Sequence, residues 1–493
     1  MSPKIDPEKD YYAFLDLSVE AEEAEIKQAY RQLARRYHPD AREGDEEAFR
    51  RVQEAYEVLG NRALRRAYDR QREARGLTPD APISCDFLLS RTRIPAMDSD
   101  QMIYLLVEIE PARDLPKQRQ SLNLALVIDR STSMSGHRIE NVKLAAHDLV
   151  DSLRPSDRLA VVAFSDRAEI LAESTRGDDK VELHSAISHL HPGGGTEIYR
   201  GLVAGLDEVR RHATPESIDH VIFLTDGRTY GDESLALAEA QRAGAEGIGI
   251  SALGIGEDWN DLFLDALARR GNGVSEYINS PTQIRALLRD QIRDLGSIVA
   301  RGVRLQMTPT DYVRVPSVYR VAPYIENMLT PSGEPILLGN LSDETVILLM
   351  EIVVRQPQTG DRRMVRLDLE ANTHDQQARI RIRRDVVARF VMGRPEPEAV
   401  PMRLLSLLAR LSIFRLQEQA WEALESGNAE HATHLLESAA TRLFDMGYRE
   451  LAQAALVEAG RVSRGGTASL GGRKKLRYGT RSLSARPKRS DRL

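Results

Sequence analysis

Three oxygen-bearing side chains follow a short apolar segment at a spacing of two residues: Asp129, Ser131 and Ser133. The apolar run at residues 124–128 predicts a buried strand, and apolar residues at helical spacing across 138–153 predict a helix after the turn. Polar residues at the carboxyl end of a parallel strand lie where open α/β sheets bind ligands. Because a carboxylate with two hydroxyls suits a hard cation, the turn predicts a site for Mg²⁺ or Mn²⁺.

Two later stretches supply further oxygen ligands. Thr196 follows the glycines at 193–195, and Asp226 follows a second apolar run at 221–224. In this order the three stretches resemble the metal-ion-dependent adhesion site of von Willebrand factor A domains, over residues 123–295. The resemblance implies a metal held by Asp129, Ser131, Ser133, Thr196 and Asp226, with an acidic residue of a protein partner completing the coordination.

Alternating apolar runs and helical patterns must position these side chains. The alternation predicts a mostly parallel, doubly wound sheet. We expect strands at 124–128, 158–164, 221–224 and 248–253, and helices at 138–153, 180–190, 199–211, 234–243 and 260–269. The flanks at 83–120 and 297–393 alternate apolar and polar residues, which predicts a β-sandwich with the A domain, 121–296, inserted between its halves.

The N-terminal residues 10–72 have a different, helical pattern. They contain Asp-Tyr-Tyr at 10–12, a helix with basic residues every four positions, and Arg-Arg-Ala-Tyr-Asp at 65–69. Together they resemble a J domain, the module of DnaJ-type co-chaperones. The resemblance implies two sets of residues that bind a DnaK-type ATPase chaperone: the basic helix face, Lys27, Arg31 and Arg35, and the signature turn, His38, Pro39 and Asp40.

Three further segments complete a multidomain α+β chain. Glycine and proline without apolar periodicity predict a linker at 73–82. Apolar stripes broken by Gly427 and Gly447 predict a short helical bundle at 400–462. The segment 463–493 is rich in Gly, Ser, Arg and Lys, so we expect a disordered basic tail.

Composition narrows the class of protein. The 493 residues suffice for several domains, and the formal net charge of −6 gives no reason to expect nucleic-acid binding. Cys85 is the only cysteine, which excludes an internal disulfide and a zinc site built on repeated Cys-x-x-Cys pairs. A polar start and the lack of a long uncharged apolar run predict a cytoplasmic protein without a membrane span.

The leading hypothesis is a non-enzymatic co-chaperone adaptor that recruits a DnaK-type chaperone and binds a client through the A domain. The first alternative is an interaction scaffold in which the A domain dominates and the J domain is accessory. A metal-dependent hydrolase, with His184, His189 and His191 as zinc ligands, is less favoured. The sequence contains no nucleophile elbow, phosphate-binding lysine motif or Cys/His pair to support catalysis.

Overall fold

The computed structural model describes most of the chain. The residues outside the description are 1–5, 7–8, 10, 16, 18–20, 22, 38–45, 75–82, 113–119, 228–230, 279–280, 331–332, 357, 374–378, 394, 397 and 484–493. The fold divides into an N-terminal helical unit and a larger unit that begins at Pro82.

The N-terminal unit is a small helical domain. Its helices are α1 (Tyr11–Phe14), α2 (Glu23–Tyr37), α3 (Glu46–Leu59) and α4 (Arg62–Ala74). The rings of Tyr30 and Tyr56 stack at 4.0 Å and join α2 to α3. The Tyr68 hydroxyl accepts a hydrogen bond from the Tyr11 backbone N–H at 3.0 Å and thereby ties α4 to α1. The aromatic residues of the expected J-like pattern therefore form the core of this unit.

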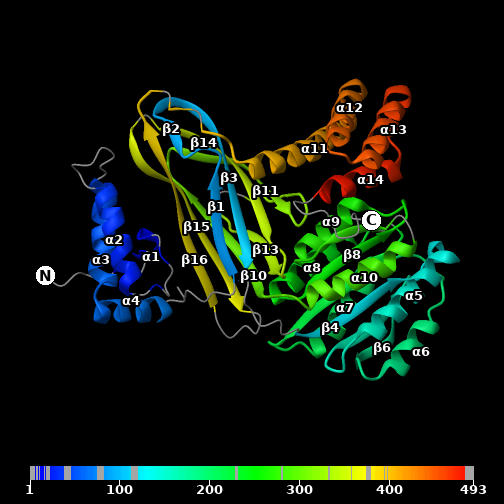
Figure 1. Ribbon diagram of the computed structural model, residues 1–493. Helices are drawn as coiled ribbons and strands as arrows, with labels where there is room; N and C mark the ends of the chain where they lie inside the picture. Colours follow the sequence, from blue (N-terminus) through cyan, green and yellow to red (C-terminus); the bar gives the residue numbers. More distant parts are fainter. Residues whose placement is uncertain are drawn as a thin grey trace. The chain divides into compact units, whose positions relative to one another are not determined.

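A second domain has the predicted doubly wound sheet (Figure 1). Its strand order is β6-β5-β4-β7-β8-β9, parallel except for the antiparallel edge strand β6. The strands are β4 (Ser121–Asp129), β5 (Arg158–Phe164), β6 (Ala168–Arg176), β7 (Ser217–Thr225), β8 (Gly249–Ile255) and β9 (Ser275–Ile278). The four predicted strands are confirmed, whereas the two edge strands were not expected.

Helices cover both faces of this sheet. The helices are α5 (His137–Ser152), α6 (Lys180–Ser188), α7 (Ile198–Arg211), α8 (Glu233–Glu246), α9 (Asp261–Arg270) and α10 (Pro281–Leu295). Successive strand residues point to opposite faces. Leu124, Leu126 and Ile128 therefore pack with α5, α6 and α10, and Ala125 and Val127 pack with α7, α8 and α9.

The flanks on both sides of this domain combine into two sheets, as predicted. The strand orders are β1-β3-β14-β11-β12 and β13-β10-β15-β16-β2. The first flank supplies β1 (Ile83–Leu89), β2 (Arg93–Pro95) and β3 (Met97–Pro111). The second supplies β10 (Ala300–Pro309), β11 (Val313–Ala322), β12 (Glu326–Asn327), β13 (Ile336–Leu341), β14 (Val346–Gln356), β15 (Gly360–Thr373) and β16 (Arg379–Val391). Arg384 joins the two sheets, because its Nε atom donates a hydrogen bond to the Cys85 carbonyl oxygen at 3.1 Å.

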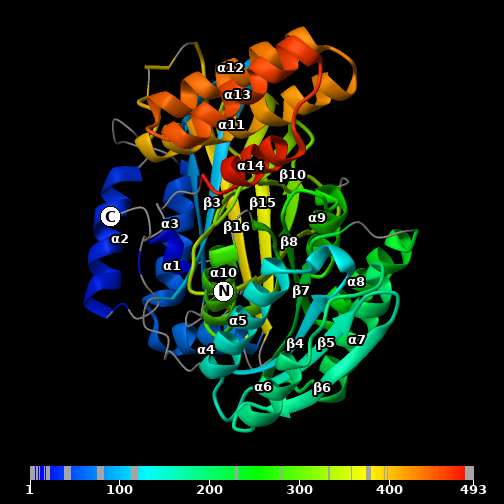
Figure 2. The ribbon, with the colours of Figure 1, turned by 90° about the vertical axis from the view of Figure 1, so that its right-hand side faces the viewer.

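The C-terminal helices extend further than predicted. They are α11 (Met402–Glu425), α12 (Ala429–Asp445), α13 (Arg449–Gly465) and α14 (Leu470–Arg481). The expectation of a disordered basic tail from residue 463 is wrong up to residue 483, because α13 continues through Gly465 and α14 packs among α11, α13 and the α/β domain (Figures 1 and 2). The rest of that tail, 484–493, lies outside the described residues.

Among the helices in the described ranges, none is both long enough and apolar enough to cross a membrane.

Candidate metal centre

The two predicted carboxylates lie at one edge of the doubly wound sheet. β4 ends at Asp129, and the neighbouring parallel strand β7 ends at Thr225, directly before Asp226. Both carboxylates are buried, with 0% and 1% of each residue exposed. A buried carboxylate is costly unless a cation or hydrogen-bond donors compensate its charge, so this edge of the sheet requires a partner for each aspartate.

Hydrogen bonds connect the carboxylates to the serine turn. Asp129 Oδ1 accepts the backbone N–H of Ser131 at 2.8 Å, and its Oδ2 accepts the Thr225 hydroxyl at 2.6 Å. The Ser131 and Ser133 hydroxyls lie 3.0 Å apart, and Ser133 Oγ donates to Asp226 Oδ1 at 2.7 Å. Four of the five predicted residues therefore form one connected cluster.

Thr196 completes the set from a separate loop. A Cβ atom added to Gly227 would lie 3.1 Å from Thr196 Oγ1 and 3.7 Å from Asp129 Oδ2, so the hydroxyl and the carboxylate both border Gly227. The loop is held against the serine turn because Gly193 N–H donates to the Arg130 carbonyl at 2.6 Å, and Thr132 N–H donates to the Gly194 carbonyl at 3.1 Å. The structure thus brings all five predicted residues together.

The cluster offers oxygen donors only, which fits a hard cation. It has two carboxylates, and no group of three or more His, Cys, Asp or Glu suited to a metal occurs in the described part of the chain. Burial raises the pKa of the Asp129 carboxyl, with a further contribution from the charge of Asp226, while hydrogen bonds from Thr225 and Ser131 oppose the rise. A divalent cation between the aspartates would remove this electrostatic penalty.

Two contributors to the cluster were missed in the sequence. Thr225 holds Asp129, and the Nη1 atom of Arg138 donates to Asp226 Oδ2 from the first turn of α5. The available signal for Thr225 was its place at the end of the apolar run, directly before Asp226. Arg138 had no comparable signal, because a basic residue early in an amphipathic helix usually faces solvent.

The predicted chaperone-binding residues divide between described and undescribed parts of the chain. Lys27, Arg31 and Arg35 are exposed along α2 and repeat every four residues, so they share one face of that helix. His38, Pro39 and Asp40 lie outside the described residues.

The histidines considered as zinc ligands have separate partners. His184 shares a 2.7 Å hydrogen bond with His147 through their Nδ1 atoms, and its Nε2 lies 3.2 Å from an Asp151 oxygen. The ring of His189 bonds the Ser185 carbonyl at 2.7 Å, and that of His191 bonds the His189 carbonyl at 2.6 Å.

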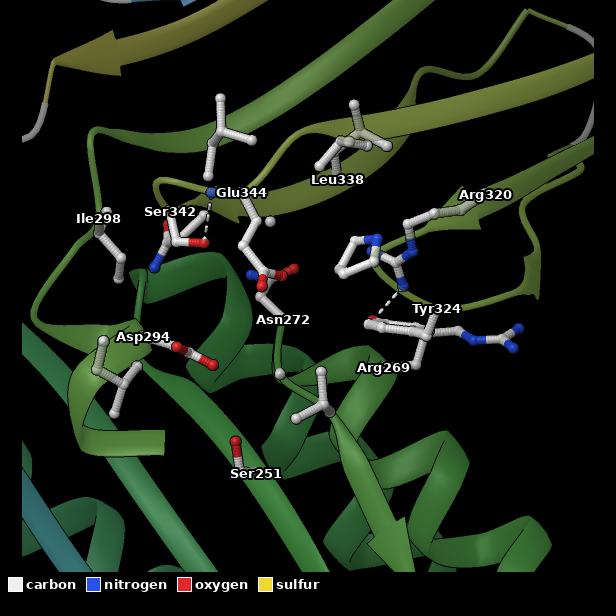
Figure 3. Close-up of a pocket in the computed structure, with 18 of the residues that line it drawn as sticks. Ser251, Arg269, Asn272, Asp294, Ile298, Arg320, Tyr324, Leu338, Ser342 and Glu344 are labelled. Carbon is white, nitrogen blue, oxygen red and sulfur yellow. Dashed lines mark hydrogen bonds between the residues drawn. The ribbon is translucent and has the colours of Figure 1, made fainter. Parts of the chain in front are cut away.

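A cavity of about 190 Å³ lies away from this cluster, between the start of β8 and the sandwich (Figure 3). Ser251, Asp294, Glu344 and Arg320 are among the polar residues that line it. Burial, together with nearby Glu344 and Asp290, raises the pKa of Asp294 to about 6, against the opposing effect of Arg293. No arrangement of these groups selects one ligand class, because acidic and basic side chains both border the space.

Comparison with known proteins identifies the domains. Residues 123–289 match the family model of the von Willebrand factor type A domain, and residues 10–69 match that of the DnaJ domain. The chain carries a DnaJ domain and a von Willebrand factor type A domain. Residues 402–486 match a third family, described as the Sll0103-like, C-terminal alpha-helical domain.

Relatives share parts of this arrangement. The uncharacterised protein sll0103 of Synechocystis is 29% identical over 286 residues, which span 56% of this chain and 68% of that protein. The uncharacterised protein YfbK of Escherichia coli is 26% identical over 218 residues, 43% of this chain and 38% of its own length. The chaperone protein DnaJ 1 of Streptomyces avermitilis is 49% identical over 75 residues, which span 15% of this chain and 19% of that protein.

Two solved structures share the fold beyond the A domain. The von Willebrand factor type A protein from Catenulispora acidiphila aligns with a TM-score of 0.66 and 17% identity, covering 83% of this chain and 98% of that one. The ArnB paralog VWA2 from Sulfolobus acidocaldarius aligns with a TM-score of 0.51 and 18% identity, covering 83% of this chain and 100% of that one. At these identities the likeness concerns the fold alone.

Proposed function

We propose that this protein is a co-chaperone adaptor that links a DnaK-type chaperone to a partner bound by the A domain. The observation that carries the proposal is the presence of a DnaJ domain and an A domain on one chain. The J domain would recruit the chaperone and stimulate its ATP hydrolysis, so the bond-breaking chemistry belongs to the chaperone. The A domain would select the protein or complex on which the chaperone acts.

The J domain would supply two contacts to the chaperone. The exposed basic face of α2, formed by Lys27, Arg31 and Arg35, suits an acidic patch on the partner. Exposed ion pairs contribute little affinity individually but increase the association rate and orient the encounter. The signature residues His38, Pro39 and Asp40 would then trigger ATP hydrolysis.

The A domain would bind its partner through Mg²⁺ or Mn²⁺. Asp129, Asp226 and the hydroxyls of Ser131, Ser133 and Thr196 would hold the ion, which supplies an electrophilic centre for an incoming carboxylate. This set has five oxygen-bearing residues, three of which are neutral hydroxyls, and a hard cation accepts six or more oxygen ligands, so an acidic side chain of the partner can complete the coordination. The partner is therefore expected to present an exposed Asp or Glu.

Steady-state ATP turnover by a cognate DnaK-type chaperone tests the proposal. The full chain should accelerate turnover, and His38→Gln should return it to the basal rate while the far-ultraviolet circular-dichroism spectrum stays unchanged. Asp129→Ala is the matched control, because it should retain stimulation but lose Mg²⁺-dependent partner capture in a pull-down followed by mass spectrometry.

The outcomes separate this function from the alternatives. Equal stimulation by wild type and His38→Gln, or no stimulation by either, would contradict the co-chaperone role. Mg²⁺-dependent capture without any stimulation would instead favour a scaffold in which the J domain is accessory.

A further inference from the structure

Arg138 is held against the metal centre by contacts on two sides. Its Nη1 atom donates to Asp226 Oδ2 and lies 3.4 Å from the carbonyl oxygen of Ser133. On the other side it packs on Gly256, where an added Cβ would lie 3.2 Å from Nη2. Gly256 has a positive φ of 75°, so this loop conformation also favours glycine. The guanidinium therefore fits between the serine turn and the loop after β8.

The charge of Arg138 compensates one of the two buried aspartates. The Asp226 side chain is 0% exposed, whereas that of Arg138 is 36% exposed, so the guanidinium reaches inward from the surface. Ser133 donates to the other oxygen of the same carboxylate, at 2.7 Å. Asp129, in contrast, receives bonds from the neutral donors Ser131 and Thr225. The guanidinium of Arg138 therefore pairs with Asp226 and not with Asp129.

A divalent cation would need the same carboxylate. Cations that share one small, buried site repel each other strongly, since the interior screens charge less than water does. The ion and the guanidinium therefore cannot both remain on Asp226 without cost. Because Arg138 is partly exposed, it can turn toward solvent and still lie beside the site.

We propose that Arg138 is a further functional residue of the metal centre, a resident counter-ion that competes with the divalent cation for Asp226 and favours an acidic partner once the cation is bound. This inference rests on the metal-dependent function proposed above. Without the arginine, a divalent ion between two aspartates leaves a neutral site. With the displaced guanidinium nearby, the loaded site has one excess positive charge, which one carboxylate of the partner neutralises.

Binding of Mn²⁺ alone to the full chain tests the competition. Calorimetric titration after removal of metal by EDTA should show that Arg138→Gln binds Mn²⁺ about tenfold more tightly than wild type, or better, because the competing charge is gone. The same variant should melt at a lower temperature in EDTA, since Asp226 then lacks a cation. Its melting temperature should also rise more on addition of Mn²⁺.

Two further variants control for fold and charge. Arg138→Lys retains the positive charge, so its Kd for Mn²⁺ should stay within about threefold of wild type. Arg242→Gln removes a 60% exposed arginine of α8 that pairs with Glu239 and Glu246, and it should behave as wild type. A tighter Kd in the lysine variant as well would overturn the charge argument.

The results also separate this inference from the proposed function. If Arg138→Gln binds Mn²⁺ with the wild-type Kd while wild type still captures its partner in a metal-dependent manner, the result overturns the role of Arg138 and leaves the proposed function intact. If neither protein binds Mn²⁺, both the metal dependence and the competition are overturned.

Discussion

Lys474 of α14 provides a sharp test of how the C-terminal helix is attached. Its Nζ atom donates to the carbonyl oxygens of Glu257 and Trp259, each at 2.6 Å, and lies 4.1 Å from the centroid of the Trp259 ring. The residue is 2% exposed. The ammonium group thus replaces its hydration shell with two carbonyls and an aromatic face. We predict that Lys474→Ala destabilises the larger unit of the fold.

The magnitude follows from the interactions that alanine removes. A hydrogen bond to a charged group contributes about 1.5–3 kcal/mol, and a desolvated cation–π contact contributes about 2 kcal/mol. The substitution also abolishes the desolvation cost of the ammonium, which offsets part of the loss. We therefore expect the free energy of unfolding to fall by about 2–4 kcal/mol, with a decrease in melting temperature of roughly 5 °C.

Urea unfolding monitored by tryptophan fluorescence measures this change. One of the two tryptophans of the chain, Trp259, lies directly beneath Lys474 and reports on the contact. The matched control is Lys475→Ala, which truncates an exposed lysine of the same helix and should change the unfolding free energy by less than about 0.5 kcal/mol. An identical midpoint for wild type and Lys474→Ala would refute the reasoning.

Two other predictions concern the A domain. Mg²⁺ at a hundredfold excess over its Kd should stabilise the fold by about 2.7 kcal/mol, and Asp129→Ala should remove this gain in a thermal-shift titration. Burial lowers the pKa of His220 to about 4, so the unfolded chain binds the proton more readily and stability should decrease as pH falls from about 6.5 to 4. Between pH 7 and pH 4.5, the free energy of unfolding should fall less in His220→Gln than in wild type. An equal fall in both proteins would contradict the role assigned to His220.

The core of the A domain was predictable because its strands are continuous apolar runs. β4, β5, β7 and β8 lie inside the sheet and are covered on both faces, which requires apolar residues at successive positions. The edge strand β6 contains exposed positions such as Glu169 and Ile170, so its pattern is weaker. Interior strands of this sheet are therefore easier to predict from the sequence than its edge strands.

The clustering of the candidate site residues was predictable because their position depends on topology. Parallel neighbouring strands bring Asp129 and Asp226 to the same edge of the sheet, whatever the detailed side-chain packing. The pairing of Arg138 with Asp226 depends instead on the rotation of α5 and on space beside Gly256. Those quantities follow from three-dimensional packing, so local spacing gave no indication of this pair.

The C-terminal segment was wrongly predicted to be disordered, because amino-acid composition gives the number of charged residues but not the groups with which they pair. The abundance of Gly, Ser, Arg and Lys suggested a disordered tail, yet Lys474, Arg477 and Arg481 are spaced to share one face of a helix. Arg477 pairs with Asp261 at 2.9 Å, and Arg481 pairs with Asp265 at 2.9 Å. Those two aspartates are themselves four residues apart on α9, so a matching acidic spacing about two hundred residues earlier was the available signal.

The attachment of α14 also relates the C-terminal helices to the candidate metal site. The loop after β8 provides the Glu257 and Trp259 carbonyls that accept Lys474, and it provides Gly256, on which Arg138 packs. Helix α14 and the guanidinium beside Asp226 therefore contact a single short loop. Because that loop borders the predicted metal site, the basic segment is a structural component of this edge of the A domain, and its charges serve to hold the fold together.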